Sequence, residues 1–354
     1  MKILAIDIGA GTQDILLFDS AKKIENCISL VLPTPSKFIA EKLKSIDSHV
    51  YIYGDTIGGG SLIRAILNHL KNGYRVAMEE SAAYSIRNDL DEVKSMGIEV
   101  GKDLSFNDFQ KLEIREVDLP VLEDFVSNFG ENLQVDVIAI AVQDHGVAPK
   151  EVSDRAFRFE KMETMLKKDK RPETFSFAEN SIPSYYLRMK SAVKAVRRTS
   201  TTPILVMDTS FSAILGCMEE VTGPSLVVNV GNGHTIAALV IERKIEGLYE
   251  HHTHELTPEK LERDLGLLTK GELDGKKVFE ENGHGAITLN PYKGEVQLFV
   301  TGPNRDVFKG TRMKFTYAAP GGNTMMTGPM GLVRAAQYWI STRSQTLEGI
   351  EQSA

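Results

Sequence analysis

The sequence predicts an α/β protein built from two duplicated lobes with a ligand cleft between them. Residues 3–19 form an apolar run ending in Asp7, a glycine-rich turn and a second apolar run, which is typical of a tight β-hairpin. The same pattern returns in residues 228–240, where Asn229 stands 222 positions after Asp7. Strands and helices are expected to alternate in both halves. Two copies so far apart indicate a duplicated domain and not a solenoid.

The first half is expected to contain mostly strands, with helices between the later ones. The continuous β-branched run at 135–142 is typical of a buried parallel strand. Asn72-Gly73 provides a C-cap for the helix before it. The expected strands are 2–8, 13–19, 24–32, 49–53, 74–78 and 135–142, and the expected helices are 36–46, 61–71 and 79–88.

The second half is expected to repeat this order after a helical connection. Residues 155–170 and 184–198 are predicted helices, and the basic face of the second is expected to be solvated rather than to bind nucleic acid. Thr257-Pro258 is a typical helix start. The later expected strands are 204–207, three within 225–251, 296–301 and 313–319, and the later helices are 212–220, one after Thr257, and 329–340.

These elements suggest three parts. Residues 1–146 are expected to form the N-terminal lobe, residues 147–203 an inserted or bridging helical region, and residues 204–354 the C-terminal lobe. The chain is long enough for two or three domains.

Composition excludes several functional classes. The 354 residues contain 41 Lys and Arg and 48 Asp and Glu, so the net charge of −7 provides no global field for nucleic-acid binding. The apolar runs are shorter than the roughly 20 residues of a membrane helix, and no secretory signal precedes the first strand. Cys27 and Cys217 are far apart and are expected to be buried thiols in a reducing cytoplasm. Oligomeric state is left open.

The two glycine turns offer backbone N–H groups to an anion, so two that face each other could clamp one polyphosphate. This arrangement resembles the actin/Hsp70/sugar-kinase (ASKHA) superfamily of ATP-binding proteins. The resemblance implies two actin-like (ribonuclease H-like) lobes with ATP and Mg²⁺ in the cleft between them. A third segment, residues 299–305, looks like the adenosine loop of that superfamily. The nucleotide-binding residues implied are Gly9, Ala10, Gly11, Thr12, Gln13, Gly231, Asn232, Gly233, His234, Thr235, Gly302, Pro303 and Asn304.

Asp7 is the expected metal-associated residue. In the superfamily this Asp organises Mg²⁺, usually through water, which suits a small cation that dehydrates reluctantly. The alternative is an Asp that caps its own turn. Asn229 departs from the Asp that ATP-hydrolysing relatives carry at this position. The departure favours phosphoryl transfer to an acceptor over simple hydrolysis and makes Asp7 the single carboxylate of the two loops.

Asp208 and Asp144 are the candidate general bases. Asp208 ends an apolar strand before a small-residue helix, which resembles the FGGY sugar kinases, but it could equally be an N-cap. Asp144 lies in Gln143-Asp144-His145-Gly146, which also ends a buried strand. Gln143 could position water or substrate, and His145 could contact substrate. A polar loop without a catalytic role is the alternative.

Two further segments are weaker candidates for a binding site. Gly58–Gly60 opens a helix and could bind an anion, although a flexible connection is favoured. In the run from His251 to Glu255, His252 and His254 could share a metal site, but a surface strand end is favoured because no ligand-spacing motif is present.

The sequence therefore predicts an Mg-ATP-binding phosphotransferase, similar to sugar kinases, that acts on a small hydroxylated acceptor. The alternatives are a nucleotide-driven conformational switch acting on a protein partner and a binder without catalysis. The chain also looks like a prokaryotic family often labelled "putative pyruvate formate-lyase-activating protein". A radical activase holds its iron–sulfur cluster on closely spaced cysteines, and Cys27 and Cys217 are 190 positions apart, so that chemistry is rejected.

Overall fold

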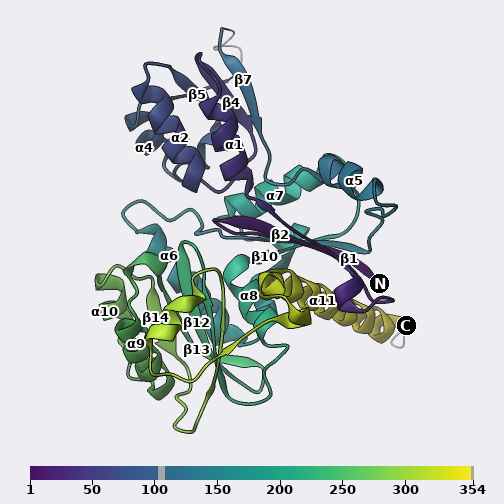
Figure 1. Cartoon of the computed structure of the whole chain (residues 1–354), viewed down its shortest axis with the longest axis vertical. Coiled ribbons are helices and arrows are strands. Elements are labelled where there is room, and N and C mark those ends of the chain that lie inside the picture. Colours follow the sequence, from purple (N-terminus) through teal and green to yellow (C-terminus); the bar gives the residue numbers. More distant parts are fainter. Residues whose placement is uncertain (103–107, 352–354) are drawn as a thin grey trace.

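The computed structural model describes residues 1–102 and 108–351, with side chains through residue 342. The described chain forms three sheets with helices packed around them (Figure 1). Two of these sheets carry the duplication, and the third is a separate layer at the upper end of the view in Figure 1.

The first sheet has the order β3-β2-β1-β8-β10-β9. Strand β1 pairs antiparallel with β2 and parallel with β8, and β10 lies parallel beside β8. The edge strand β9 is antiparallel to β10. The strands are β1 (Lys2–Ile8), β2 (Thr12–Asp19), β3 (Ile28–Pro33), β8 (Val137–Val142), β9 (Ser176–Ala178) and β10 (Ile204–Asp208).

The second sheet repeats this topology in the order β14-β13-β12-β11-β15-β16. Strand β11 pairs antiparallel with β12 and parallel with β15, as β1 does with β2 and β8. In both sheets the five equivalent strands follow the order 3-2-1-4-5, so the predicted fold of two duplicated actin-like (ribonuclease H-like) lobes is confirmed. The strands are β11 (Ser225–Val230), β12 (His234–Ile241), β13 (Lys244–His252), β14 (Gly285–Thr288), β15 (Gln297–Thr301) and β16 (Thr316–Tyr317).

Two glycine-bearing helices join the lobes, α8 (Thr209–Cys217) and α11 (Thr327–Glu351). A Cβ atom on Gly216 would lie 1.8 Å from the carbonyl oxygen of Thr327, and one on Gly331 would lie 1.8 Å from that of Ser212. The two helix backbones therefore touch, which only glycine permits. This contact brings the N-termini of both helices to the same place between the sheets.

The third sheet is an insertion between β3 and β8. Its four parallel strands have the order β6-β5-β4-β7 and a hydrophobic core of their own. The strands are β4 (Val50–Gly54), β5 (Val76–Met78), β6 (Ile98–Val100) and β7 (Gln110–Ile114), with helices α1 (Pro35–Lys44), α2 (Gly60–Lys71), α3 (Glu80–Ala83) and α4 (Leu90–Ser95). The chain returns to the first sheet through α5 (Leu119–Ser127).

The predicted boundaries at 146 and 203 do not follow the sheets. Strands β9 and β10 both belong to the first sheet, so the first lobe continues to Asp208 and beyond it into α8. The self-contained insertion is the third sheet and not residues 147–203. The sequence led to a boundary at 203 because β10 begins a new apolar run after a helical stretch. This pattern resembles the start of a new lobe.

Residues 147–203 contain α6 (Asp154–Lys168) and α7 (Leu187–Arg197), near the predicted helices. The second lobe adds α9 (Pro258–Lys270), which is capped by Thr257 as predicted, and α10 (Gly275–Glu280). Short 3₁₀ segments occupy Ile24–Asn26, Pro172–Phe175, Glu179–Ser181, Thr253–Glu255, Arg305–Gly310, Pro320–Gly322 and Thr324–Met326. The predicted strand 24–32 therefore starts later, and the predicted helix 79–88 is shorter.

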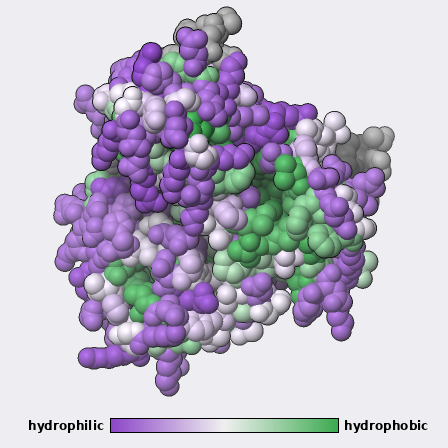
Figure 2. All heavy atoms as spheres, turned by 45° about the horizontal axis from the view of Figure 1, so that its top comes forward, coloured by the Kyte–Doolittle hydropathy of each residue, from purple (hydrophilic) through white to green (hydrophobic). Residues whose placement is uncertain are grey.

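The face shown in Figure 2 is mostly hydrophilic, with one broad apolar area. Exposed apolar side chains include Phe38 of α1 and Val121 and Phe125 of α5, which line a hollow of about 760 Å³ between the insertion and the first lobe. None of the helices among the described residues combines the length and the apolar character needed to cross a membrane.

Candidate functional site

The two glycine turns face each other across a small cavity of about 100 Å³. Both turns are closed by the same hydrogen bond: Gly9 N donates to Thr12 O and Gly231 N donates to His234 O, each at 3.0 Å. The loops also touch, because a Cβ atom on Gly11 would lie 2.0 Å from Asn232 Nδ2. The duplication seen in the sequence therefore produces two equivalent turns in contact.

Most of the predicted nucleotide-binding residues line this cavity. They are Gly9, Ala10, Gly11, Thr12, Gly231, Asn232, Gly233, His234, Gly302 and Pro303. Three others do not. The Gln13 amide donates to Pro33 O, the Thr235 hydroxyl pairs with that of Thr253, and Asn304 Nδ2 donates to Gly231 O. Asn304 therefore supports the second turn from behind.

Asp7 lies under the first turn and faces a second carboxylate. The register of the hairpin places Asp14 directly opposite Asp7, and both residues line the small cavity. Thr209 Oγ1 donates to Asp7 Oδ1 at 2.6 Å, while Asp14 Oδ1 is buried without a hydrogen-bond partner in the described structure. Burial and then the Asp14 carboxylate raise the pKa of Asp7 to about 8, and burial raises that of Asp14 to about 6. Asp7 is therefore not the single carboxylate that the sequence suggested.

The N-termini of α8 and α11 close the other side of the cavity. Thr209 and Thr327 begin these helices, and both line the cavity. A Cβ atom on Gly328 would lie 1.8 Å from Asp7 Oδ2, so the helix backbone contacts this carboxylate directly. Free N–H groups and the positive end of the helix dipole favour an anion there. The cavity thus combines two glycine turns, two helix N-termini and one pair of acidic side chains.

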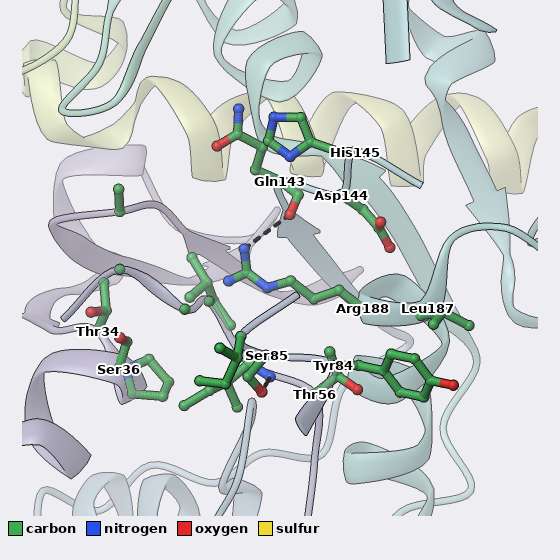
Figure 3. A pocket seen from close by; sticks show the side chains of 18 of the residues that line it. Thr34, Ser36, Thr56, Tyr84, Ser85, Gln143, Asp144, His145, Leu187 and Arg188 are labelled. Carbon is green, nitrogen blue, oxygen red and sulfur yellow. Dashed lines mark hydrogen bonds between the residues drawn. The ribbon is translucent and has the colours of Figure 1, made fainter. Parts of the chain in front are cut away.

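A larger cavity of about 390 Å³ adjoins the small one on the side of the insertion (Figure 3). Gly9, Ala10 and Gln143 line both cavities, so the two spaces are neighbours that share a wall. The larger cavity is lined by hydroxyl groups, by Arg188 and by the Gly58–Gly60 turn at the start of α2. Arg188 Nη1 donates to Gln143 O at 3.0 Å, and its other nitrogens pair with the buried Glu116.

The two candidate bases lie in different surroundings. Asp144 lines the larger cavity, where its carboxylate accepts from Gly146 N at 2.9 Å and from Met189 N at 3.0 Å. Burial raises the pKa of Asp144 despite these bonds. Asp208 lines neither cavity. It caps α8 by accepting from Ser210 N and forms an ion pair with Arg158.

Arg158 is the centre of a buried ion triad. Its guanidinium contacts Asp208 Oδ2 at 2.6 Å and Glu250 Oε2 at 3.0 Å, and it also donates to Asp144 O at 3.1 Å. Burial alone would raise the pKa of Glu250, but the Arg158 guanidinium holds it below its usual value. Because Asp208 is paired with a cation and lines neither cavity, the structure favours the N-cap interpretation of Asp208 over the role of base.

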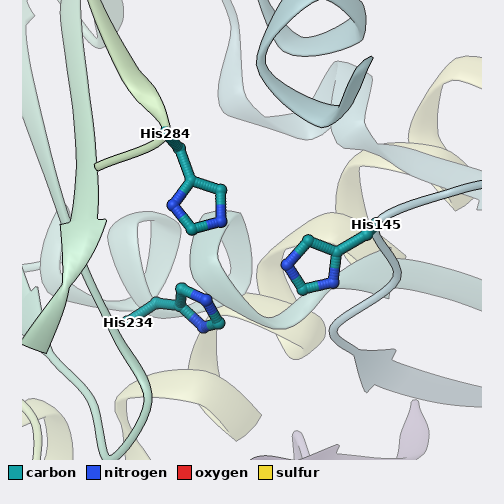
Figure 4. A group of neighbouring side chains, drawn as sticks. All are labelled: His145, His234 and His284. Atoms are coloured by element: carbon teal, nitrogen blue, oxygen red, sulfur yellow. The ribbon is translucent and has the colours of Figure 1, made fainter. Parts of the chain in front are cut away.

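Three imidazoles gather at the junction of the two cavities (Figure 4). His145 follows β8 and lines the larger cavity, His234 begins β12 and lines the small one, and His284 precedes β14. Gln143 Nε2 bonds His234 Nδ1 at 2.7 Å. Burial lowers the pKa of His145 and His284, and lowers that of His234 to about 4, so all three rings are neutral at pH 7. His254 is exposed beside Glu255, but the rest of that run does not match the predicted surface strand end. His251 is buried, and the ring centroid of His252 lies 4.9 Å from those of His234 and His284.

The sequence reading missed Asp14, Arg158, Arg188 and His284. Asp14 could have been found, since a tight turn at Gly9–Gly11 pairs residue 7 with residue 14. Arg158 and Arg188 lie within charged helices, where nothing marks a buried arginine. His284 sits alone between two glycines, and no spacing motif links it to His145 or His234.

Comparison with known proteins gives one family. A family model described as "Putative pyruvate format-lyase activating enzyme (DUF1786)" matches residues 57–307. No curated protein matches the chain. Among solved structures, the inorganic polyphosphate/ATP-glucomannokinase from Arthrobacter sp. strain KM is similar, with 12% identity over 95% of this chain and 99% of that chain and a TM-score of 0.36. An exopolyphosphatase-like protein is also similar, with 9% identity over 85% of this chain and 65% of that chain and a TM-score of 0.24. At these TM-scores the likenesses do not bear on the reaction, and the fold assignment rests on the strand order.

Proposed function

We propose that this chain, which belongs to the family whose model it matches over residues 57–307, transfers a phosphoryl group from Mg-ATP to the hydroxyl group of a small acceptor. The observation that carries the proposal is the pair of adjoining cavities. One is bounded by two glycine turns and two helix N-termini, and the other is lined by hydroxyl groups and Arg188. The lining of the first suits a phosphate chain and that of the second suits a hydroxylated acceptor, so they are called the phosphate cavity and the acceptor cavity.

The small cavity has the donors that bind Mg²⁺ and phosphate. Mg²⁺ prefers hard oxygen ligands, and the Asp7 and Asp14 carboxylates with the Thr209 hydroxyl supply them. The orphaned Asp14 Oδ1 is an oxygen that a cation would satisfy. When bound, the cation neutralises charge on the phosphate chain. Because about 100 Å³ is less than a whole nucleotide needs, we expect the lobes to separate for binding and to close again around the phosphates.

Asp144 is the proposed general base. Its carboxylate lies in the wall of the acceptor cavity, and its raised pKa makes it a better proton acceptor than an exposed Asp. In the transfer, Asp144 takes the proton of the acceptor hydroxyl as the oxygen bonds to the γ-phosphorus. The bond from that phosphorus to the β–γ bridging oxygen breaks, and ADP leaves. The Gly9–Thr12 and Gly231–His234 turns hold the charge that moves onto the leaving phosphates.

The activity in the family's printed description is not part of this proposal. A radical activase needs closely spaced cysteines for its cluster, and the sequence has only the two distant residues Cys27 and Cys217.

The test is to incubate the protein with Mg-ATP labelled at the γ-phosphate, with and without a protein-free extract of small metabolites. We expect slow ATP consumption alone, faster consumption with the extract, and a new phosphorylated compound detectable by mass spectrometry. Brisk ATP turnover without any acceptor would contradict the kinase proposal and support a nucleotide-switched ATPase. Failure of ATP to bind in a calorimetric titration would contradict both.

A further inference from the structure

We propose that His145, His234 and His284 form a binding site for one divalent transition-metal ion such as Zn²⁺, separate from the oxygen-lined Mg²⁺ site at Asp7. One ring nitrogen from each of the three residues lies within 4.8 Å of the others. The three rings converge from different elements on one point (Figure 4). The residues are 50 or more positions apart in the sequence, so only the fold brings them together.

The cluster has unused ligand atoms. Both ring nitrogens of His284 and the Nε2 atom of His234 are buried without a hydrogen-bond partner in the part of the chain that the structure describes. His284 is 2% exposed, so water does not satisfy its ring from outside. Buried polar atoms are nearly always paired, and an orphaned group therefore points to a missing partner. A metal ion accepts a lone pair from each imidazole and removes this cost.

The three ring nitrogens must move closer together to bind one ion. Zinc bonds imidazole nitrogen at about 2.0–2.1 Å, which places tetrahedral ligand nitrogens about 3.3 Å apart. The nitrogens now lie within 4.8 Å of one another, so binding requires them to approach by up to about 1.5 Å. Three protein nitrogens leave one tetrahedral position open, as in catalytic zinc sites. His145 lines the larger cavity and His234 the small one, so the proposed ion lies near both cavities. The ring centroid of His252 lies 4.9 Å from those of His234 and His284, so this side chain is a neighbour of the fourth position.

The surrounding chain fixes the backbone of each ligand. His284 N donates to Glu250 O at 2.9 Å, and Arg155 donates to the carbonyl of the neighbouring Gly283. Arg158 donates to the carbonyl of Asp144, directly before His145. A Cβ atom on Gly285 would lie 2.7 Å from the Phe159 ring, so the strand start is packed tightly on α6. The site is therefore held before any ion binds, which lowers the entropic cost of binding.

Gln143 is placed to orient His234. Its amide lies 2.7 Å from His234 Nδ1. The structure places Gln143 Nε2 against Nδ1, so metal binding requires the amide to turn over. The Gln143 oxygen then faces Nδ1, which donates to it, and the lone pair of Nε2 is left for the metal. Metal-bound histidines commonly donate their second nitrogen in this way. The same Gln143 lines both cavities, so it would connect the metal to the proposed phosphate and acceptor spaces.

The choice of metal follows from the ligands. Neutral imidazoles favour Zn²⁺, Ni²⁺, Cu²⁺ or Fe²⁺, whereas Mg²⁺ and Ca²⁺ prefer oxygen. The Asp7–Asp14 pair and the three histidines therefore select different ions.

The experiment uses the full chain without a polyhistidine tag, stripped with a chelator and titrated with Zn²⁺ in a calorimeter. We expect one high-affinity equivalent per chain. His284→Ala and His145→Ala should each weaken binding at least about 100-fold, since even loss of an orienting partner costs about 10–100-fold. His254→Ala removes an exposed histidine from the same region and should bind as the wild type does.

A second measurement keeps the test independent of folding and of catalysis. Co²⁺ in a four-coordinate site with three nitrogens gives intense visible bands, which should appear with the wild type and with His254→Ala but not with the other two variants. Circular dichroism of each variant shows whether it is folded. The site would be overturned if folded His284→Ala and His145→Ala bound Zn²⁺ as tightly as the wild type, or if His254→Ala lost binding equally. These results are independent of whether the chain phosphorylates an acceptor.

Discussion

Two pairs of buried acidic residues lie at the site, and among the described residues only Asp208 and Glu250 are paired with a cation. Asp208 and Glu250 share the guanidinium of Arg158 at 2.6 Å and 3.0 Å. Asp7 and Asp14 face each other across the first hairpin, with a hydroxyl for Asp7 and an unpartnered oxygen on Asp14. Buried charges are normally paired. The first pair is therefore complete as part of the framework, while the second is arranged to receive a cation from outside.

The difference is also visible in proton affinity. The pKa of Glu250 is held below its usual value because Arg158 outweighs burial, whereas burial and Asp14 raise that of Asp7 to about 8. The two pairs should therefore affect stability with opposite dependence on pH. Four predictions test the comparison, from the largest expected effect to the smallest.

Arg158→Met should have the largest effect. It leaves two buried carboxylates without their cation, and breaking a buried ion pair from one side costs about 3–5 kcal/mol of unfolding free energy. Chemical denaturation at pH 7 measures it. Lys167→Met, on the same helix, removes only an exposed pair with Glu163 and should cost less than about 1 kcal/mol. Equal losses in the two variants would show that the triad is not a framework element.

Asp144→Asn should lower turnover about 10²–10⁴-fold, which is the usual contribution of a general base. ATP affinity should stay the same, because Asp144 lines the acceptor cavity and not the phosphate cavity. Asp208→Asn should lower stability in denaturation experiments and affect turnover much less. If Asp208→Asn abolished turnover in the folded protein while Asp144→Asn did not, the assignment of the base would be reversed.

In the absence of metal, Asp7→Asn should change how the free energy of unfolding depends on pH. The folded pKa of about 8 exceeds the ordinary value of 3.8, so the folded state keeps a proton that the unfolded state loses. Wild-type stability in the presence of a chelator should therefore fall as pH rises from about 4 to about 8. The variant should lack most of this decline and should melt several degrees higher at pH 8.

Differential scanning calorimetry from pH 4 to pH 8 makes the measurement. Glu250 has the opposite sign, since its lowered pKa contributes stability that is lost only below about pH 4.5. Identical pH profiles for the wild type and Asp7→Asn would contradict a raised pKa at Asp7. The same variant should also lose Mg²⁺-dependent ATP affinity.

The smallest effect is expected from the turn that covers the Asp7 pair. Gly11→Ala forces the Asn232 side chain to move, because the new Cβ would lie 2.0 Å from it, and should weaken ATP binding about tenfold. Gly233→Ala is the matched control in the opposite turn, since its Cβ would meet nothing within 4 Å. Titration calorimetry compares the two. Equal affinities would mean that contact between the turns does not shape the phosphate site.

The sequence was most informative where structure is local. The equivalence of Asp7 and Asn229 predicted two lobes, and the hydrogen bonds that close the two turns are indeed the same in both. The β-branched run at 135–142 marked the central strand β8. Patterns of this kind can be recognised in the sequence because they depend on neighbours within a few residues.

The rest depends on contacts between distant residues. Asp208 ends a strand, and an Asp at that position can either cap the next helix or act in catalysis. Only its partner distinguishes the two roles. That partner, Arg158, lies 50 positions away on a charged helix, where nothing in the sequence marks it as buried. The histidine cluster could not be predicted either, because His145, His234 and His284 are far apart in the sequence and only the fold brings them together. The boundary at 203 was wrong because β10 pairs with β8 across an intervening region.

The most direct test of the phosphotransferase account is a crystal structure with Mg²⁺ and a non-hydrolysable ATP analogue. The account predicts the phosphate chain between Gly9–Thr12 and Gly231–His234, with the cation beside Asp7 and Asp14 and the terminal phosphate directed toward the cavity of Asp144. A nucleotide bound away from these turns, or a phosphate chain with no cation near Asp7, would contradict it.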